Sequence, residues 1–209
     1  MERHRIRIRF RKEGDLRLIS HRDLVRTWER LLRRAGLRLS MTEGFHPKPR
    51  MNFPSALALG IAGRNELLEL ELAEELSADE VRSRLAGQLP PGMGLEAIEV
   101  LPAGSKKARV KSLVFELGVP PDRAVEVQER IELLLASTSH LAERGDGSQP
   151  VDIRPGLAEL ALCGDKLHMR LSFSQEGGTR PRAVLEALGL GDYEQQGLVL
   201  TRTAVELET

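Results

Sequence analysis

The residues best suited to chemistry lie between Gly44 and Arg50, in the segment Gly-Phe-His-Pro-Lys-Pro-Arg. An aromatic ring that lies among cations can stack on a nucleic-acid base while the cations hold its phosphates, and Phe45, His46, Lys48 and Arg50 combine these groups. The two prolines exclude a helix and a central strand, so we expect a rigid loop. The alternative is a structural connection in which Phe45 is buried as a plug.

A second group, Ser20-His21-Arg22-Asp23, directly precedes a helical pattern. Ser20 is a favoured N-cap residue, and Asp23 follows at the position of the acidic member of a capping box. The free backbone amides and the positive end of the helix dipole would favour an anion beside His21 and Arg22. The alternative is plain capping by Ser20 and Asp23, with no ligand.

His21, His46 and Asp23 could also be metal ligands or an acid–base pair. Their spacing matches no metal motif, however, and a lone histidine is more often structural. The single cysteine, Cys163, excludes an intrachain disulfide and an all-cysteine metal site. We therefore expect no metal and no cofactor, and these three residues are catalytic candidates only if the protein is an enzyme.

Arginine alternates with apolar residues in the first predicted strand, which is the pattern of a half-buried strand. The apolar residues predicted to face the core are Ile6, Ile8 and Phe10. The opposite face carries Arg5, Arg7, Arg9 and Arg11. Such a row of like charges favours a polyanion, although glutamates of a neighbouring strand could equally neutralise it.

A glycine-rich turn, Gly177-Gly178-Thr179-Arg180-Pro181-Arg182, opens a later predicted helix. Glycines let a backbone approach a phosphate closely, and Arg180 and Arg182 could clamp it. The turn lacks the lysine and spacing of a P-loop and does not match a dinucleotide fingerprint. The alternative, which the missing lysine and spacing favour, is a simple turn between a hairpin and a helix.

Charge is unevenly distributed along the chain, although the formal net charge is zero. Residues 1–50 contain 15 Lys and Arg against 6 Asp and Glu, a net of +9, and the remainder has a net of −9. A basic segment of this kind indicates a face that meets nucleic acid or phosphate. No stretch has the length of a membrane helix and no signal peptide is recognisable, so we expect a cytoplasmic protein without membrane contact.

Periodicity predicts an α+β fold of two tandem ferredoxin-like (split βαβ, βαββαβ) domains, residues 1–104 and 108–209. The first domain is predicted to contain strands at 5–11, 53–59, 67–72 and 95–101, with helices beginning after Ser20 and Ser77. The second is predicted to contain strands at 110–119, 157–162, 167–173 and 198–207, with helices at 121–139 and 181–188. Residues 103–107 would form the linker.

Several runs resemble a bacterial family of uncharacterised domains called radical-SAM-linked proteins. The runs are Arg9 to Lys12, Leu18 to Leu24, Leu32 to Leu37, Glu43 to Phe53 and Leu57 to Gly60. The resemblance is specific over residues 5–75 and looser to about residue 205. It implies a radical S-adenosylmethionine (SAM) protein as partner, whose cysteines would hold the iron–sulfur cluster, because this chain has too few.

The sequence and the resemblance together predict an RNA-binding accessory protein that presents tRNA or rRNA to a radical SAM enzyme and is not itself catalytic. Tandem ferredoxin-like CRISPR RNA-processing endonucleases are a weaker likeness, of architecture alone. They suggest an alternative, a metal-independent RNA endonuclease with His21 or His46 as general base. A protein-interaction adaptor, whose basic face meets an acidic partner, is the third reading.

Overall fold

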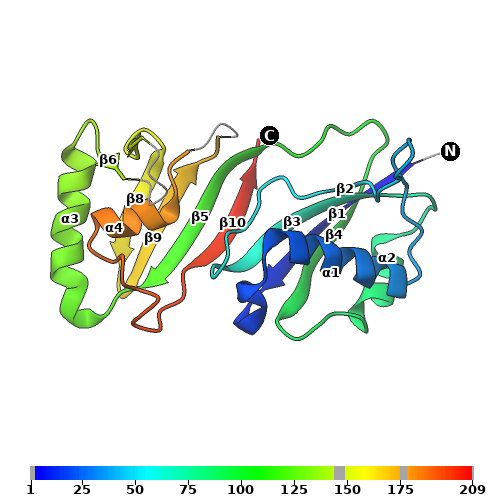
Figure 1. Cartoon of the computed structure of the whole chain (residues 1–209), viewed down its shortest axis with the longest axis horizontal. Coiled ribbons are helices and arrows are strands. Elements are labelled where there is room, and N and C mark those ends of the chain that lie inside the picture. The colour runs from blue at the N-terminus through cyan, green and yellow to red at the C-terminus, as the bar shows by residue number, and fades with distance from the viewer. Residues whose placement is uncertain (1–2, 144–148, 175–177, 209) are drawn as a thin grey trace. The chain divides into compact units, whose positions relative to one another are not determined.

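The computed structural model describes residues 3–143, 149–174 and 178–208. The chain divides into two compact units, unit 1 (residues 1–109) and unit 2 (residues 110–209). The described residues form a mixed α+β structure with four α-helices and mainly antiparallel sheet (Figure 1). In this part of the chain no helix is both long and apolar enough to cross a membrane.

Unit 1 has the element order strand, helix, strand, strand, helix, strand. Its elements are β1 (His4–Lys12), the short 3-10 helix η1 (Gly14–Leu18), α1 (His21–Arg34), β2 (Met51–Asn52), β3 (Ala62–Leu72), α2 (Ala78–Ala86) and β4 (Met93–Leu101). The strands lie in the order β4-β1-β3-β2, and each neighbouring pair is antiparallel. The described part of unit 1 therefore combines an antiparallel sheet with two α-helices, as the α+β prediction expects.

The core of unit 1 lies on one face of this sheet. Ile6, Ile8 and Phe10 are fully buried there, as the alternation predicts, and they pack with Leu24 and Trp28 of α1. The rings of Phe10 and Trp28 meet edge to face, with 5.0 Å between their centroids. Since successive side chains of a strand point to opposite faces, this packing directs the arginines of β1 to the other face of the sheet.

Both helices of unit 1 begin at the predicted caps. Ser20 accepts a hydrogen bond from the Asp23 backbone N–H, and Ser77 forms a complete capping box with Glu80. Gly36 follows α1 with φ of 67°, a left-handed conformation that residues with a side chain rarely adopt. These local sequence patterns therefore determine where α1 and α2 start and where the chain leaves α1.

The predicted strand at 53–59 is wrong, because strand pairing in this region is confined to Met51 and Asn52. Pro54 has no N–H to donate to a neighbouring strand, so the chain leaves the sheet here. Leu57 is nevertheless buried, at 3% exposure. Phe53 is only partly buried and Leu59 is 54% exposed, so this irregular segment buries only some of the apolar residues that suggested a strand.

Unit 2 has four main strands in the order β10-β5-β9-β8, again antiparallel throughout. Its elements are β5 (Val110–Gly118), the 3-10 turn η2 (Pro121–Arg123), α3 (Ala124–Ala136), β6 (Leu141–Ala142), β7 (Val151–Asp152), β8 (Leu157–Cys163), β9 (Lys166–Ser172), α4 (Pro181–Ala187) and β10 (Thr201–Leu207). Strands β6 and β7 form a separate two-stranded ribbon. The predicted helix 121–139 is shorter than expected, since its first turn is 3-10 and it ends at Ala136.

Candidate nucleic-acid interface

The segment between α1 and β2 forms a closed loop rather than a helix or strand. The backbone N–H of Thr42 donates to the carbonyl of Lys48 at 2.8 Å, and the N–H of Lys48 donates to Oγ1 of Thr42 at 2.9 Å. One residue further out, Met41 and Pro49 form an isolated antiparallel bridge. These contacts tie the two ends together, and we call residues 42–48 the Phe45 loop.

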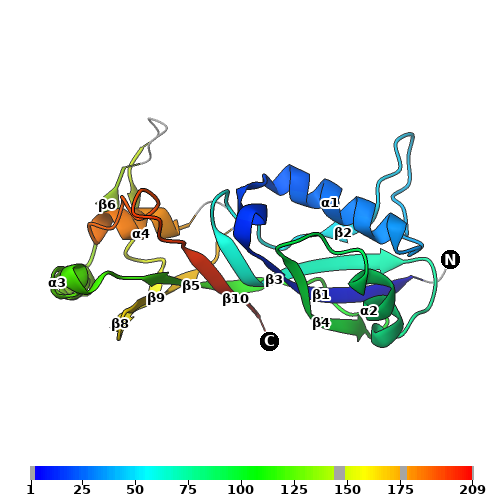
Figure 2. The ribbon, with the colours of Figure 1, turned by 90° about the horizontal axis from the view of Figure 1, so that it is seen from below.

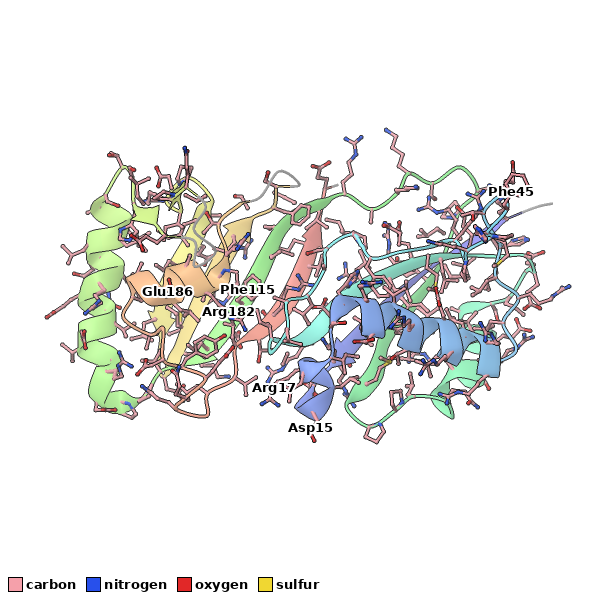
Figure 3. All side chains as sticks on the ribbon, viewed as in Figure 1. Asp15, Arg17, Phe45, Phe115, Arg182 and Glu186 are labelled. Atoms are coloured by element: carbon pink, nitrogen blue, oxygen red, sulfur yellow. The ribbon has the colours of Figure 1, made fainter. Side chains whose placement is uncertain are left out.

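The Phe45 loop stands on the same side of the unit 1 sheet as α1 (Figure 2). Phe45 has a relative exposure of 103%, so the alternative that buries it as a plug is wrong (Figure 3). His46 and Lys48 are exposed as well. Among the residues that the structure describes, no side chain forms a hydrogen bond or ion pair with the imidazole of His46 or the ammonium of Lys48. The loop therefore presents one aromatic face and two groups available to a ligand.

Arg50 lies at the base of the Phe45 loop and is partly buried. Its Nε donates to the carbonyl of Met41 at 3.0 Å, and the same nitrogen lies 3.8 Å from a carboxylate oxygen of Glu71. Its side chain is 28% exposed. Arg50 thus supports the loop, and only part of its guanidinium remains for a ligand.

The arginines of β1 face acidic and polar side chains of neighbouring strands. Arg5 and Arg7 both bind Glu69 of β3, at 3.0 and 2.9 Å, and Glu69 is only 4% exposed. Arg9 donates to Asn65 at 3.3 Å, and Arg11 lies 3.5 Å from Glu96. Glutamates of neighbouring strands thus pair with Arg5, Arg7 and Arg11, while the partner of Arg9 is an uncharged amide. The four arginines therefore do not form a free row of cations for a polyanion.

Burial also acts on one guanidinium of this row, that of Arg9. Desolvation lowers the pKa of Arg9 from its usual value, and the nearby Arg7 acts in the same direction, while the negative charge of Glu99 opposes both. Arg11 is the member of the row with the most exposed side chain, at 53%. It lies 3.9 Å from Glu13 in addition to its contact with Glu96.

The start of α1 is organised as a cap. The Ser20 hydroxyl donates to Asp23 at 2.7 Å, and this hydrogen bond lowers the pKa of the Asp23 carboxyl from its ordinary value. His21 is partly buried, and its ring meets Phe53 edge to face at 5.4 Å. Arg22 is exposed. The capping prediction is confirmed, and His21 packs against the irregular segment after β2.

Helix α1 also carries a row of exposed arginines that we did not predict as a site, apart from its first member. The row contains Arg22, Arg26, Arg30 and Arg33. Their spacing of three or four residues places them on neighbouring turns of one helix face. Arg26 lies 3.4 Å from Asp23, whereas no residue that the structure describes makes a hydrogen bond or ion pair with the guanidinium of Arg22, Arg30 or Arg33. Their position off the apolar stripe of α1 was the signal in the sequence.

The two arginines predicted in the glycine-rich turn lie in unit 2. Gly177 falls outside the described residues. Arg180 is the exposed N-cap of α4, and Arg182 binds Glu194 at 2.7 Å and the Tyr193 hydroxyl at 3.2 Å. Arg182 is therefore already held by acidic and phenolic groups of its own unit.

No group of three His, Cys, Asp or Glu side chains in the described part of the chain could hold a metal ion. Cys163 is exposed. Two features that could contact a ligand are the Phe45 loop and the face of α1 that carries Arg22, Arg30 and Arg33, both in unit 1. They define the candidate site of an α+β protein whose chemistry suits an anion with aromatic groups, as in a nucleic acid.

The chain belongs to the bacterial family described as "Uncharacterized protein conserved in bacteria (DUF2344)", whose pattern matches residues 5–181. A comparison with curated proteins finds no match. Among solved structures, the chain is similar to an unknown protein from Galdieria sulphuraria, with 11% sequence identity, 100% of each chain covered and a TM-score of 0.32. A similarity at that TM-score supports no statement about fold or function.

Proposed function

We propose that this protein is an RNA-binding accessory protein that works with a radical SAM enzyme in the modification of tRNA or rRNA. The observation that carries the proposal is the full exposure of Phe45 beside His46 and Lys48. An exposed aromatic residue has no role in the core, whereas a base stacked on it gains contact area, and adjacent cations bind the phosphates. The proposal includes a ferredoxin-like fold for both units, which the order of their strands supports.

The arginine face of α1 adds a sequence-independent contribution. Arg22, Arg30 and Arg33 can reach phosphates without first breaking an ion pair, unlike Arg5 and Arg7, which would have to leave Glu69. We therefore assign the phosphate contacts to α1 and Lys48 rather than to β1. The enzyme partner rests on the family resemblance. An iron–sulfur cluster needs several cysteine ligands, so the cluster would belong to that partner.

Salt dependence of RNA binding tests the proposal. Fluorescence anisotropy with labelled tRNA and with an rRNA fragment should show binding at low salt that weakens steeply between about 50 and 200 mM salt, with a log–log slope near −0.7 for each single-stranded phosphate contact. Replacing Lys48 with Ala should make this slope shallower. Arg38→Ala is the matched control, because Arg38 is an exposed cation of the same unit that already pairs with Glu74.

The same samples separate the accessory protein from the alternatives. Intact RNA on a gel after incubation without metal supports a binder. If the RNA is cleaved, and His46→Ala or His21→Ala slows cleavage by about 10²–10⁴-fold, the protein is a nuclease and our proposal is wrong. Absence of RNA binding even at low salt would favour the protein-interaction adaptor.

A further inference from the structure

A cavity of about 200 Å³ lies at the base of the Phe45 loop, within unit 1. Its walls come from β1, β2, β3, both ends of the loop and the segment after β4. Its charged lining residues are Arg5, Arg50, Glu69, Glu71 and Lys107. Charged side chains make up five of the ten lining residues, so a ligand that fills the cavity must carry polar groups.

Glu69 lies in one wall of the cavity, and both of its carboxylate oxygens already accept hydrogen bonds. One of its oxygens binds Arg7, and the other accepts hydrogen bonds from Arg5 at 3.0 Å and from the Ala108 backbone N–H at 3.1 Å. Arg5 also donates to the carbonyl of Ser105. The segment predicted as a linker is therefore fastened to the sheet, and these contacts fix the part of the chain that carries Lys107.

Glu71 differs from Glu69 in having no hydrogen-bond donor. Its Oε2 is buried and accepts no hydrogen bond from the residues that the structure describes. The nearest cations, Arg3 and Arg50, lie 3.9 and 3.8 Å from this oxygen, too far for a hydrogen bond. The Glu71 side chain as a whole remains 22% exposed and lines the cavity. A ligand with N–H donors would complete the site.

Lys107 supplies the complementary charge. It is exposed, and its ammonium makes no hydrogen bond or ion pair with the described residues, although it lines the cavity. Arg50 contributes a second, partly exposed guanidinium. The cavity therefore offers a carboxylate acceptor and cations together, a combination that matches a ligand with an amine at one end and a phosphate at the other.

Size and position connect this ligand to the Phe45 loop. A volume of 200 Å³ is that of about seven water molecules in the liquid, which is room for one pyrimidine base but not for a whole nucleotide. Thr42, which lines the cavity, is three residues from Phe45, a span of at most about 10 Å in an extended chain. One RNA strand can therefore contact both the cavity and Phe45.

We infer that the cavity binds one base of the RNA, a base that carries an exocyclic amine, and that the Glu71 carboxylate accepts a hydrogen bond from this amine. Lys107 and Arg50 bind the adjoining phosphate. A carboxylate accepts from the N4 amine of cytosine but is repelled by the O4 carbonyl of uracil at the equivalent position. This inference rests on the proposed RNA binding and adds base selection to it.

The test compares labelled oligocytidylate and oligouridylate of equal length, with tRNA measured in parallel. Wild-type protein should bind oligocytidylate about tenfold more tightly or better. In Glu71→Gln this preference should disappear or reverse, because an amide N–H can donate to the uracil O4. Glu96→Gln is the matched control, since it removes the same charge from unit 1 outside the cavity and should keep the preference.

Lys107→Ala should weaken binding of both oligonucleotides by a similar factor, whereas Lys106→Ala, its neighbour outside the cavity, should have a smaller effect. If thermal melting shows that Glu71→Gln does not fold, the comparison of Lys107→Ala with Lys106→Ala tests the inference instead. Equal binding of both oligonucleotides by wild type, or equal effects of the two lysines, overturns the inference while the binding of tRNA leaves the proposed function intact. Failure to bind tRNA as well overturns both.

Discussion

At the scale of single residues, Phe45 and Phe10 show how environment decides what the same side chain does. Phe10 is fully buried and packs against Trp28, whereas Phe45 is fully exposed at 103%. A phenyl ring in water loses no packing when it is removed, while a buried ring leaves a cavity. The two positions therefore allow stability and binding to be measured separately.

Phe45→Ala is expected to leave the melting temperature nearly unchanged and to reduce RNA affinity by about 1–3 kcal/mol, because one stacked base loses its platform. Phe10→Ala, the control, should cost about 3–5 kcal/mol of folding stability. Thermal melting and anisotropy on both variants check this. Unchanged RNA affinity of Phe45→Ala would mean that the exposed ring is not a stacking surface for RNA.

The sequence predicted which face of β1 carries the arginines, but it did not predict their ion-pair partners. Alternation with Ile6, Ile8 and Phe10 correctly assigned the two faces of the strand. The partner of Arg5 and Arg7 is Glu69, more than sixty residues later, and the register of β1 on β3 brings it opposite Arg7. Such a register depends on the packing of the whole unit, so pattern alone left both the free and the neutralised row open.

At the scale of elements, the starts of α1 and α2 were predictable because their capping signals are local. The capping box of α2 needs only Ser77 and Glu80, three residues apart, and both of its hydrogen bonds form. Strand β2 shows the opposite case. Its two residues pair with β3 only over Met51–Asn52, and the apolar content of 53–59 did not reveal that Pro54 would end the strand.

The cap of α2 gives a prediction about pH. Hydrogen bonds from the hydroxyl and backbone N–H of Ser77 lower the pKa of Glu80 from its ordinary value of 4.5. A carboxyl with a lowered folded-state pKa stabilises the folded state above its unfolded pKa, and this contribution is lost as the pH falls through the folded-state value. Glu80→Ala should therefore be less stable than wild type at neutral pH, and the difference should shrink in acid.

Denaturant unfolding of both proteins from neutral pH to below the ordinary glutamate pKa measures this difference. Asp79→Ala is the control, since Asp79 lies in the same helical turn but makes no hydrogen bond with Ser77. The difference in unfolding free energy between Asp79→Ala and wild type should depend less on pH than the difference between Glu80→Ala and wild type. A Glu80→Ala deficit that stays constant down to the lowest pH would contradict the role of the ionised carboxylate.

At the scale of the whole molecule, charge is divided between the two units. Unit 1 contains 21 Lys and Arg against 15 Asp and Glu, a net of +6, and unit 2 contains 10 against 16, a net of −6. The basic excess of the first fifty residues is therefore only partly neutralised within its own unit. Because long-range attraction of a polyanion follows summed charge, unit 1 should attract RNA and unit 2 should repel it.

This division predicts where RNA will protect the protein. In hydrogen-exchange mass spectrometry at low salt, bound tRNA should slow amide exchange in the Phe45 loop and in the segment around Lys107. Peptides of α3 and α4 in unit 2 should exchange at the same rate with and without RNA, because the net charge of unit 2 opposes a phosphate backbone and Arg182 is held by Glu194. Raising the salt concentration should remove the protection in unit 1, since the contacts to phosphates are screened. Strong protection around Arg180 with none in the Phe45 loop would move the RNA site to unit 2, whereas protection of unit 1 alone would support the RNA site that we propose there.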